Sequence, residues 1–279
     1  MLNYRARDRI SNWTAIILLG LLLVIMVGPL LMVVLNSVKT EAEYTANGPL
    51  ALPVSFSLES LTLAWNRIDY PVKLMNSIWI SLAASFLAIV ISLFNAFAMG
   101  IGRVRGATFF LIFFIIAITL PGESLIYPHY YMFKWAKLYD TRLSVILILG
   151  ALNSAFGTYL LTSVFKSFPR ELIEAAMIDG AGTFKLLWRM VVPIALPSLS
   201  VLFVFFFIWT FNEFFLPLIF LVSNDKQTVP LAIALAKSER GVVITLQSAA
   251  SLLGILPCIL FFVLFQRTLT RGVTAGSVK

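Results

Sequence analysis

The sequence predicts an all-α integral membrane protein with six transmembrane helices. Of its 279 residues, 60% are hydrophobic and only 12% are charged, whereas soluble domains average about 25% charged residues. Six apolar segments are long enough to cross a bilayer, since a hydrocarbon core of about 30 Å requires about 20 residues of helix. Each must be helical, because lipid offers no hydrogen-bond partner for free backbone groups. We therefore expect a single transmembrane domain over residues 1–279.

The expected helices are spread along the whole chain. They are placed at Thr14–Leu35, Leu74–Ile101, Ala107–Gly122, Leu143–Phe165, Pro197–Leu221 and Val242–Phe265. Arg5, Arg7 and Arg9 give the first segment the basic start of a secretory signal peptide, but its apolar run is too long and no small-x-small cleavage site follows. We therefore expect a retained first helix.

The distribution of basic residues predicts the orientation. Six spans place both termini on the same side, and that side carries more than half of the 21 Lys and Arg residues. Because cytoplasmic loops are enriched in Lys and Arg, we expect both termini in the cytoplasm. The net charge of +8 is then a signal of topology. Nucleic-acid binding is not expected, because the basic residues do not cluster with exposed aromatics in a soluble domain.

The sequence gives little indication of a metal, disulfide or nucleotide site. Cys258 and His129 are the single residues of their types, so no internal disulfide and no metal site are expected, and each is more simply structural than functional. The turn Gly100–Gly106 has the spacing GxGxxxG, but it follows a membrane helix and the chain has no GxxxxGK[ST] motif. If the protein uses ATP, a partner must bind it.

Two polar loops are expected on the outer side. Asn36–Lys73 contains several Pro and acidic residues, which predicts irregular structure with one short helix near Leu58–Trp65. Glu123–Arg142 is rich in Tyr and has two interpretations. One is an aromatic belt at the membrane interface. The other is a rim that contacts sugar, because aromatic faces stack on sugar rings.

Small residues recur four positions apart in the second expected span. Ser92, Ala96 and Gly100 form this small-xxx-small pattern. Small side chains let two helix backbones approach closely. The pattern therefore predicts tight packing against a neighbouring helix.

Polar residues within or near the spans are candidates for a translocation pathway. They are Asn95, Asn153, Tyr159, Asn212 and Glu213. Glu213 is the one acidic residue inside a span, and intramembrane ionisable residues are functional candidates. It also lies close to the outer interface, so solvation there is an equal alternative. Helix-to-helix hydrogen bonding explains the other polar residues equally well, and Pro217 predicts a kink in the fifth span.

Segment 166–193 is a polar, helix-forming stretch between two apolar runs. Ser167 and Pro169 suit the start of a helix, and Glu171 and Glu174 favour its first turns through the helix dipole. Such a helix fits a docking surface for another protein better than a lipid surface, because interfacial helices on lipid are rich in Lys and Arg.

Two glycines divide this segment. Gly180 and Gly182 permit a sharp turn that ends the first helix. A second short helix is expected from Thr183 to Met190, and Pro193 would shape the return to the membrane. The prediction is two short helices joined by a glycine elbow on the cytoplasmic face.

The order of residues in this segment forms a specific motif. It reads Glu174-Ala-Ala-x-x-x-Gly180, with Pro193 thirteen residues beyond the glycine. This resembles the EAA loop of the permeases of binding-protein-dependent ABC importers. The family pattern ends in I-x-L-P, and Met190-Val-Val-Pro193 keeps its apolar character.

The resemblance extends over nearly the whole chain, and it points to the carbohydrate-uptake branch, similar to the six-span permease of maltose uptake. The strings that carry it are Asn36-Ser-Val-Lys-Thr40, Asn76-Ser77, Phe156-Gly-Thr-Tyr159, Asn212-Glu-Phe-Phe-Leu-Pro217 and the tail Arg271–Lys279. It implies a permease in a bacterial or archaeal inner membrane. The implied partners are a second homologous permease, two ATP-binding subunits that hold ATP and Mg²⁺, an extracytoplasmic substrate-binding protein and a carbohydrate substrate.

The resemblance also implies roles for particular residues. The EAA loop is the coupling helix of the family, so Glu174, Ala175, Ala176, Asp179 and Gly180, followed by Pro193, would contact the ATPase and transmit its closure by alternating access. The outer loop Ser223–Gly241 would face the binding protein. A secondary transporter or channel is the alternative, although such proteins place ionisable residues near the midplane. A membrane enzyme is a weaker one, since no base, nucleophile and orienting partner occur together.

Overall fold

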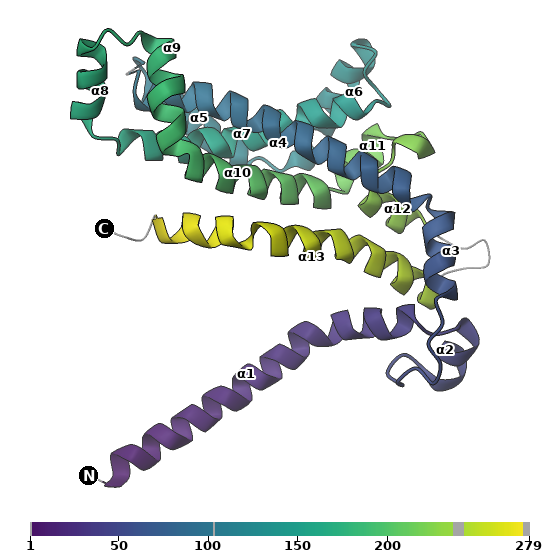
Figure 1. The fold of residues 1–279 in the computed structure, drawn as a ribbon. Helices are drawn as coiled ribbons and strands as arrows, with labels where there is room; N and C mark the ends of the chain where they lie inside the picture. Colours follow the sequence, from purple (N-terminus) through teal and green to yellow (C-terminus); the bar gives the residue numbers. More distant parts are fainter. Residues whose placement is uncertain (1, 103, 237–242, 276–279) are drawn as a thin grey trace. The chain divides into compact units, whose positions relative to one another are not determined.

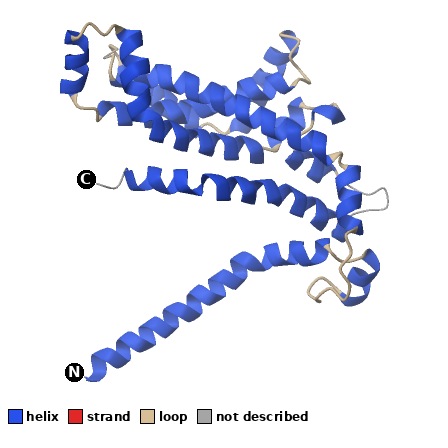
Figure 2. Cartoon of the chain, in the orientation of Figure 1, coloured by secondary structure: helices blue, strands red, loops and turns tan. Residues whose placement is uncertain are grey.

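The computed structural model describes residues 2–102, 104–236 and 243–275, and these residues form helices and loops without a strand (Figure 2). Figure 1 labels the helices. Their bounds are α1 Leu2–Ser37, α2 Glu41–Asn47, α3 Glu59–Arg67, α4 Tyr70–Gly100, α5 Ala107–Thr119, α6 Ile126–Trp135, α7 Arg142–Lys166, α8 Arg170–Ile178, α9 Thr183–Leu186, α10 Val192–Asn212, α11 Phe215–Phe220, α12 Val229–Leu235 and α13 Ile244–Ala275. The chain divides into two compact units, Met1–Tyr70 with Ile233–Pro257 and Pro71–Ala232 with Cys258–Lys279.

The first unit contains α1, α2 and α3. Lys39 follows α1 and is fully buried, and its ammonium group donates to Asn36 Oδ1 at 3.0 Å and to the Gly48 carbonyl at 3.2 Å. The expected short helix near Leu58–Trp65 is confirmed as α3. Helix α2 was not expected in this loop. It forms because the Thr40 hydroxyl accepts from the Glu43 N–H at 3.2 Å and two acidic residues occupy its first turn.

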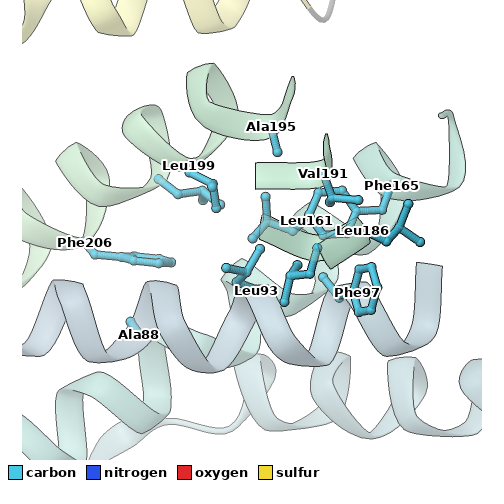
Figure 3. Close-up of a cluster of buried hydrophobic side chains, with 13 residues drawn as sticks. Ala88, Leu93, Phe97, Leu161, Phe165, Leu186, Val191, Ala195, Leu199 and Phe206 are labelled. Atoms are coloured by element: carbon cyan, nitrogen blue, oxygen red, sulfur yellow. The ribbon is translucent and has the colours of Figure 1, made fainter. Parts of the chain in front are cut away.

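The second unit is built around α4, α7 and α10. Figure 3 shows their shared core, in which side chains of these helices and of the segment before α10 converge. The approach of α4 and α7 is close. A Cβ placed on Gly157 would lie 2.2 Å from the Ser92 hydroxyl, and one on Gly100 would lie 2.7 Å from Phe165 Cβ. The tight packing predicted from Ser92, Ala96 and Gly100 is therefore confirmed, with α7 as the neighbour.

Five helices of the described chain are long and apolar enough to cross a membrane, and a bent pair makes a sixth candidate. The five are Thr14–Ser37, Tyr70–Gly100, Arg142–Lys166, Thr183–Asn212 and Ile244–Arg267. They correspond to the first, second, fourth, fifth and sixth predicted spans. The expected start of the sixth span, Val242, lies outside the described residues, as do Arg103 in the turn before α5, residues 237–241 of the outer loop and 276–279 of the tail.

The third predicted span, Ala107–Gly122, is broken. Helix α5 ends at Thr119, and the chain turns by 98° before it continues to Trp135 through a short 3₁₀ turn and α6. Pro121 explains the break, because a residue before proline is pushed out of the helical region. Leu120 accordingly has an extended backbone, with φ −69° and ψ 129°. The Tyr-rich segment that was expected to be a loop is largely helix α6.

The fifth predicted span, Pro197–Leu221, is wrong at both ends. The helix begins at Thr183 and passes through a π-helical turn, Leu187–Val191, into α10. The second short helix expected at Thr183–Met190 is therefore not separate. It continues because Leu187, Val191 and Ala195 are buried at helical spacing on one face.

The far end of this helix stops at Asn212. The kink expected at Pro217 lies four residues earlier, at Glu213. Proline has no N–H to donate to the carbonyl four residues before it, and its ring clashes with that carbonyl. Helix α11 then begins afresh at Phe215.

Candidate functional site

Helix α8 lies at one end of the α4–α7–α10 bundle, and α6 and α11 lie at the other (Figure 1). Helix α8 is preceded by Pro169, whose missing N–H is not needed in the first turn. Ser167 does not cap α8 as predicted. Its hydroxyl instead donates to the Val164 carbonyl at 2.7 Å, at the end of α7.

The predicted glycine elbow after α8 is present at Gly180. Gly180 has a left-handed backbone with φ +74°. Its N–H donates to the Met177 carbonyl at 3.0 Å, and the Ala181 N–H donates to the Ala176 carbonyl at 3.0 Å. This pair of hydrogen bonds is a Schellman motif, which satisfies the last carbonyls of a helix and favours glycine at the left-handed position. The elbow therefore fixes the direction in which the chain leaves α8.

The two faces of α8 differ. Ile173 and Ala176 pack against the buried cluster of the bundle. Glu174, Ala175 and Asp179 are exposed, and so is the apolar side chain of Ile178, at 85%. Ala176 thus faces the protein's own core, whereas Glu174, Ala175, Asp179 and Gly180 are exposed.

The exposed surface around α8 is both apolar and charged. Leu172, Met177 and Phe184 are exposed, and no side-chain hydrogen bond or ion pair is formed by Glu174 or Asp179 within the described chain. A groove of about 890 Å³ opens between α8, α9 and the adjoining ends of α4 and α7. Its lining includes Phe97, Gly100, Lys166, Arg170, Glu174 and Met177.

Pro193 lies apart from this surface. It occupies the second position of α10, beyond the π-helical turn. In that turn the Val192 N–H bonds to the Leu187 carbonyl, five residues back. Pro193 therefore contributes to the shape of the junction between α9 and α10, and it is not among the residues that line the groove.

Two of the predicted pathway residues bridge neighbouring helices. Asn95 on α4 donates to the Thr158 hydroxyl of α7 at 3.4 Å, and Asn153 on α7 donates to the Thr210 hydroxyl of α10 at 3.3 Å. The interhelical hydrogen bonding that was one interpretation of these residues is thus present. Both asparagines are only half-buried, and Tyr159 on α7 is exposed.

Asn212 and Glu213 lie where α10 ends. Asn212 is exposed, and its amide donates to the Ile208 carbonyl at 2.8 Å. The Glu213 carboxylate accepts from the N–H groups of Phe215 at 2.8 Å and Leu216 at 3.1 Å. It therefore caps the start of α11. The prediction that Glu213 lies inside a continuous span was wrong, and this capping gives the carboxylate a local role.

The opposite end of the bundle carries a polar cluster that the sequence analysis missed. We call it the outer clamp, because most of its residues belong to the loops that were expected on the outer side, and it joins the segment 223–227 to the starts of α4 and α7. Lys73 is almost fully buried and donates to the Asn224 carbonyl at 2.6 Å. Asn76 donates to the carbonyls of Asp225 at 2.8 Å and Gln227 at 2.9 Å.

Asp140 supplies the other half of the outer clamp. Its carboxylate accepts from the Ser223 hydroxyl and N–H, and it pairs with Lys226 at 2.9 Å. Desolvation alone would raise the pKa of Asp140, but the hydrogen bonds from Ser223 and Lys226 and the charge of Lys226 lower it to about 2. A lysine such as Lys73 at the start of an apolar run was the available sequence signal, since a charge there requires a partner.

The comparisons with known proteins agree with this architecture. Residues 73–274 match the profile of a family described as "Binding-protein-dependent transport system inner membrane component". The chain is 28% identical to the inner membrane ABC transporter permease protein YcjP of Escherichia coli (strain K12), over 99% of both chains. It is 27% identical to the arabinooligosaccharides transport system permease protein AraQ of Halalkalibacterium halodurans, again over 99% of both.

Two further comparisons extend this agreement. The chain is 30% identical to the sulfoquinovosyl glycerol transport system permease protein SmoH of Agrobacterium fabrum, over 90% of this chain and 88% of SmoH. The fold is shared with a crystal structure of a bacterial ABC transporter involved in the import of the acidic polysaccharide alginate, with a TM-score of 0.82, 20% identity and coverage of 94% and 97%. Since the family profile covers well over half of the sequence, this chain belongs to the inner membrane components of binding-protein-dependent transport systems.

Proposed function

We propose that this chain is the permease subunit of an ATP-driven, binding-protein-dependent sugar importer. It would form half of the translocation pathway beside a second, homologous permease, with both termini in the cytoplasm. Two ATPase subunits would bind ATP and Mg²⁺, and a soluble binding protein would deliver the substrate outside. The observation that carries the proposal is the exposed surface of α8. It presents charged and apolar side chains without partners in the described chain, on a helix whose end is held by backbone hydrogen bonds.

The coupling argument concerns α8 and its elbow. ATP binding can shift the permease between inward- and outward-open states only if the ATPase grips one state better. The ATPase would contact the exposed residues of α8 and its elbow, which are Glu174, Ala175, Asp179 and Gly180. Ala176 would act from the inner side, by packing α8 against the bundle. Because α9 continues into α10, only the short turn at residues 179–182 separates α8 from a membrane-spanning helix, and movement of α8 would be passed through that turn.

The pathway argument concerns the half-buried polar side chains. The half-buried Asn95 and Asn153 and the exposed Tyr159 and Asn212 offer hydrogen-bonding groups on α4, α7 and α10, which are the helices that would move. We propose that Asn95 and Asn153 alternate between their present partners, Thr158 and Thr210, and transported substrate. Glu213 would act at the outer end of the path by keeping α11 in place.

The substrate class follows from the relatives. AraQ is named for arabinooligosaccharides, SmoH for sulfoquinovosyl glycerol, and AmyC of Thermoanaerobacterium thermosulfurigenes for starch degradation products. We propose an oligosaccharide or a glycoside as the substrate of this transporter. The names differ in the sugar, so a panel of substrates is needed.

The test is uptake by proteoliposomes that contain the chain with its copurifying subunits. Labelled arabinooligosaccharides, maltooligosaccharides and glycosyl glycerols would be offered with the binding protein, with ATP on the ATPase side or with an imposed proton or sodium gradient. The proposal predicts uptake with ATP and none with gradients alone. Uptake driven by a gradient without ATP would favour the secondary-transporter alternative.

A further inference from the structure

Helix α6 has an exposed aromatic face that no part of the proposed transport mechanism uses. Tyr127, Tyr131 and Trp135 are 77%, 67% and 87% exposed. They are spaced four residues apart, so they form one stripe along the helix. On the other side of α6, Phe133 is buried and its ring meets Phe220 edge-on at 5.9 Å. The helix is thus fixed to the bundle by one face and leaves its aromatic face open.

The direction of α6 relative to α5 decides what this face meets. Helix α5 is apolar and exposes Phe109, Phe113 and Ile116, as expected of a helix that contacts lipid. The helical segment that contains α6 is bent by 98° from α5. If α5 crosses the bilayer, α6 therefore runs along the plane of the membrane.

The length of α5 places α6 near one edge of the bilayer. Its 13 residues extend about 20 Å at 1.5 Å per residue. The extended residues Leu120 and Pro121 add about 7 Å. The sum approaches the thickness of about 30 Å of the hydrocarbon core. Helix α6 thus reaches the layer where lipid headgroups begin.

The chemistry of the exposed face fits that layer. Tyr and Trp are enriched at membrane interfaces, because their rings are apolar and their O–H and N–H groups are polar. Lys134 extends over the Tyr130 ring at 5.3 Å, and so brings a positive charge close to the same layer. Unlike α8, which carries Glu171 and Glu174, helix α6 contains no carboxylate side chain that anionic headgroups would repel.

We propose that α6 is an interfacial helix whose stripe of Tyr127, Tyr131 and Trp135 lies in the headgroup layer of the outer leaflet. The stripe would fix the depth of the bundle in the membrane, on the side where the outer clamp holds α4 and α7 together. This inference is independent of the proposed substrate and of the ATPase. The experiments that test it therefore give an answer whether ATP or an ion gradient drives transport.

Spin labels test the depth and the direction of α6 together. In a Cys258→Ser background, nitroxides would be attached to Tyr127→Cys, Tyr131→Cys and Trp135→Cys, each in the full chain with its copurifying subunits. The vesicles would contain phosphatidylethanolamine and phosphatidylglycerol. Accessibility to oxygen and to a polar nickel chelate gives the depth of each label. Phe113→Cys on α5 and Asp225→Cys in the exposed segment after α11 are the lipid and water controls.

The proposal predicts the same depth at all three positions, about 5 to 10 Å into the boundary between headgroups and acyl chains. A helix that continued across the membrane would instead separate the labels at 127 and 135 by about 12 Å, which would overturn the proposal. The proposal would also be overturned if the three labels on α6 were as accessible to the nickel chelate as the label at Asp225→Cys. Immobilisation of such labels by added oligosaccharide or binding protein would assign the face to that partner.

A milder substitution provides a second measurement. Wild-type chain and Trp135→Phe would be compared in vesicles that contain lipids brominated close to the headgroup. The proposal predicts that the wild type shows additional quenching which disappears in Trp135→Phe. Equal quenching in both proteins would contradict contact between Trp135 and lipid.

Discussion

The two ends of the α4–α7–α10 bundle use their charged residues in opposite ways. In the outer clamp, Lys73 and Asp140 are paired with backbone and side-chain groups of one short segment. Around α8, Glu174 and Asp179 form no such bonds in the described chain, although backbone hydrogen bonds satisfy the carbonyls of Ala175, Ala176 and Met177 at the helix end. The charges of Lys73 and Asp140 are thus paired within the bundle, whereas those of Glu174 and Asp179 at the α8 end are exposed and available to a partner. The difference suggests that one end holds the bundle together and the other binds a partner.

The largest effect is expected at the α8 elbow. Gly180→Trp should abolish uptake, because a side chain in the left-handed conformation costs about 1 to 2 kcal/mol and the indole would also obstruct the outer surface. Membrane insertion should remain normal, since no atom lies within 4 Å of the position of the added Cβ. ATP-dependent uptake and the amount of chain in the membrane would be measured together.

Gly182→Trp is the matched control for this elbow. Gly182 is equally open, but its φ of −63° suits any residue. It should therefore lose less uptake than Gly180→Trp. Equal loss in the two variants would show that bulk, and not the elbow's backbone, decides the result.

The second effect concerns the stability of the clamp end. Lys73→Met should lower the free energy of unfolding by about 1 to 3 kcal/mol, because the Asn224 carbonyl would lose its buried donor. The melting temperature of the detergent-solubilised chain would be compared with that of Lys185→Met, an exposed lysine at the other end. Identical melting temperatures for both variants would contradict a structural role for the clamp.

A smaller effect is expected from a single charge on α8. Glu174→Gln should reduce the stimulation of ATP hydrolysis by the permease by up to about fivefold. This corresponds to the loss of an exposed ion pair, which contributes about 1 kcal/mol at most. The melting temperature should not change, since Glu174 has no partner within the described chain. Glu171→Gln on the same helix is the control. If Glu174→Gln lowered the melting temperature instead, the side chain would belong to the fold and not to an interface.

The smallest effect is the response of the clamp to pH. The pKa of Asp140 is lowered from 3.8 to about 2, so the clamp contributes stability above pH 3.8 and loses it as the pH falls towards 2. Between pH 5 and pH 8, about the usual range of maximal stability, this carboxylate should cause no change. Asp140→Asn should reduce the acid dependence of the melting temperature. An unchanged acid profile would mean that other carboxylates determine it.

The helices that cross the membrane were predictable because their signal is local. Apolar runs of sufficient length give the position of a span, and Gly180 gives the elbow, since few residues other than glycine adopt a positive φ. The close packing of α4 also followed from the spacing of Ser92, Ala96 and Gly100, although this spacing did not identify α7 as the neighbour. These features depend on residues within one segment.

The features that the sequence did not reveal depend on contacts between distant segments. Asn224 is the partner of Lys73, but 151 positions separate the two residues along the chain. The continuation of α9 into α10 depends on burial against α4 and α7, which overrides the helix-ending tendency of Pro193. The break at Leu120 was the exception, because Pro121 was a local signal that a count of apolar residues ignored.

The most direct test of the central claim is copurification. The tagged chain would be isolated in a gentle detergent from its native host, and its companions would be identified by mass spectrometry, for the wild type, Gly180→Trp and Lys73→Arg. The account predicts that an ATPase and a second permease accompany the wild type and Lys73→Arg, and that Gly180→Trp loses the ATPase but keeps the permease. An ATPase retained at the wild-type level by Gly180→Trp, or a wild-type chain that transports without any ATPase, would contradict the role of α8.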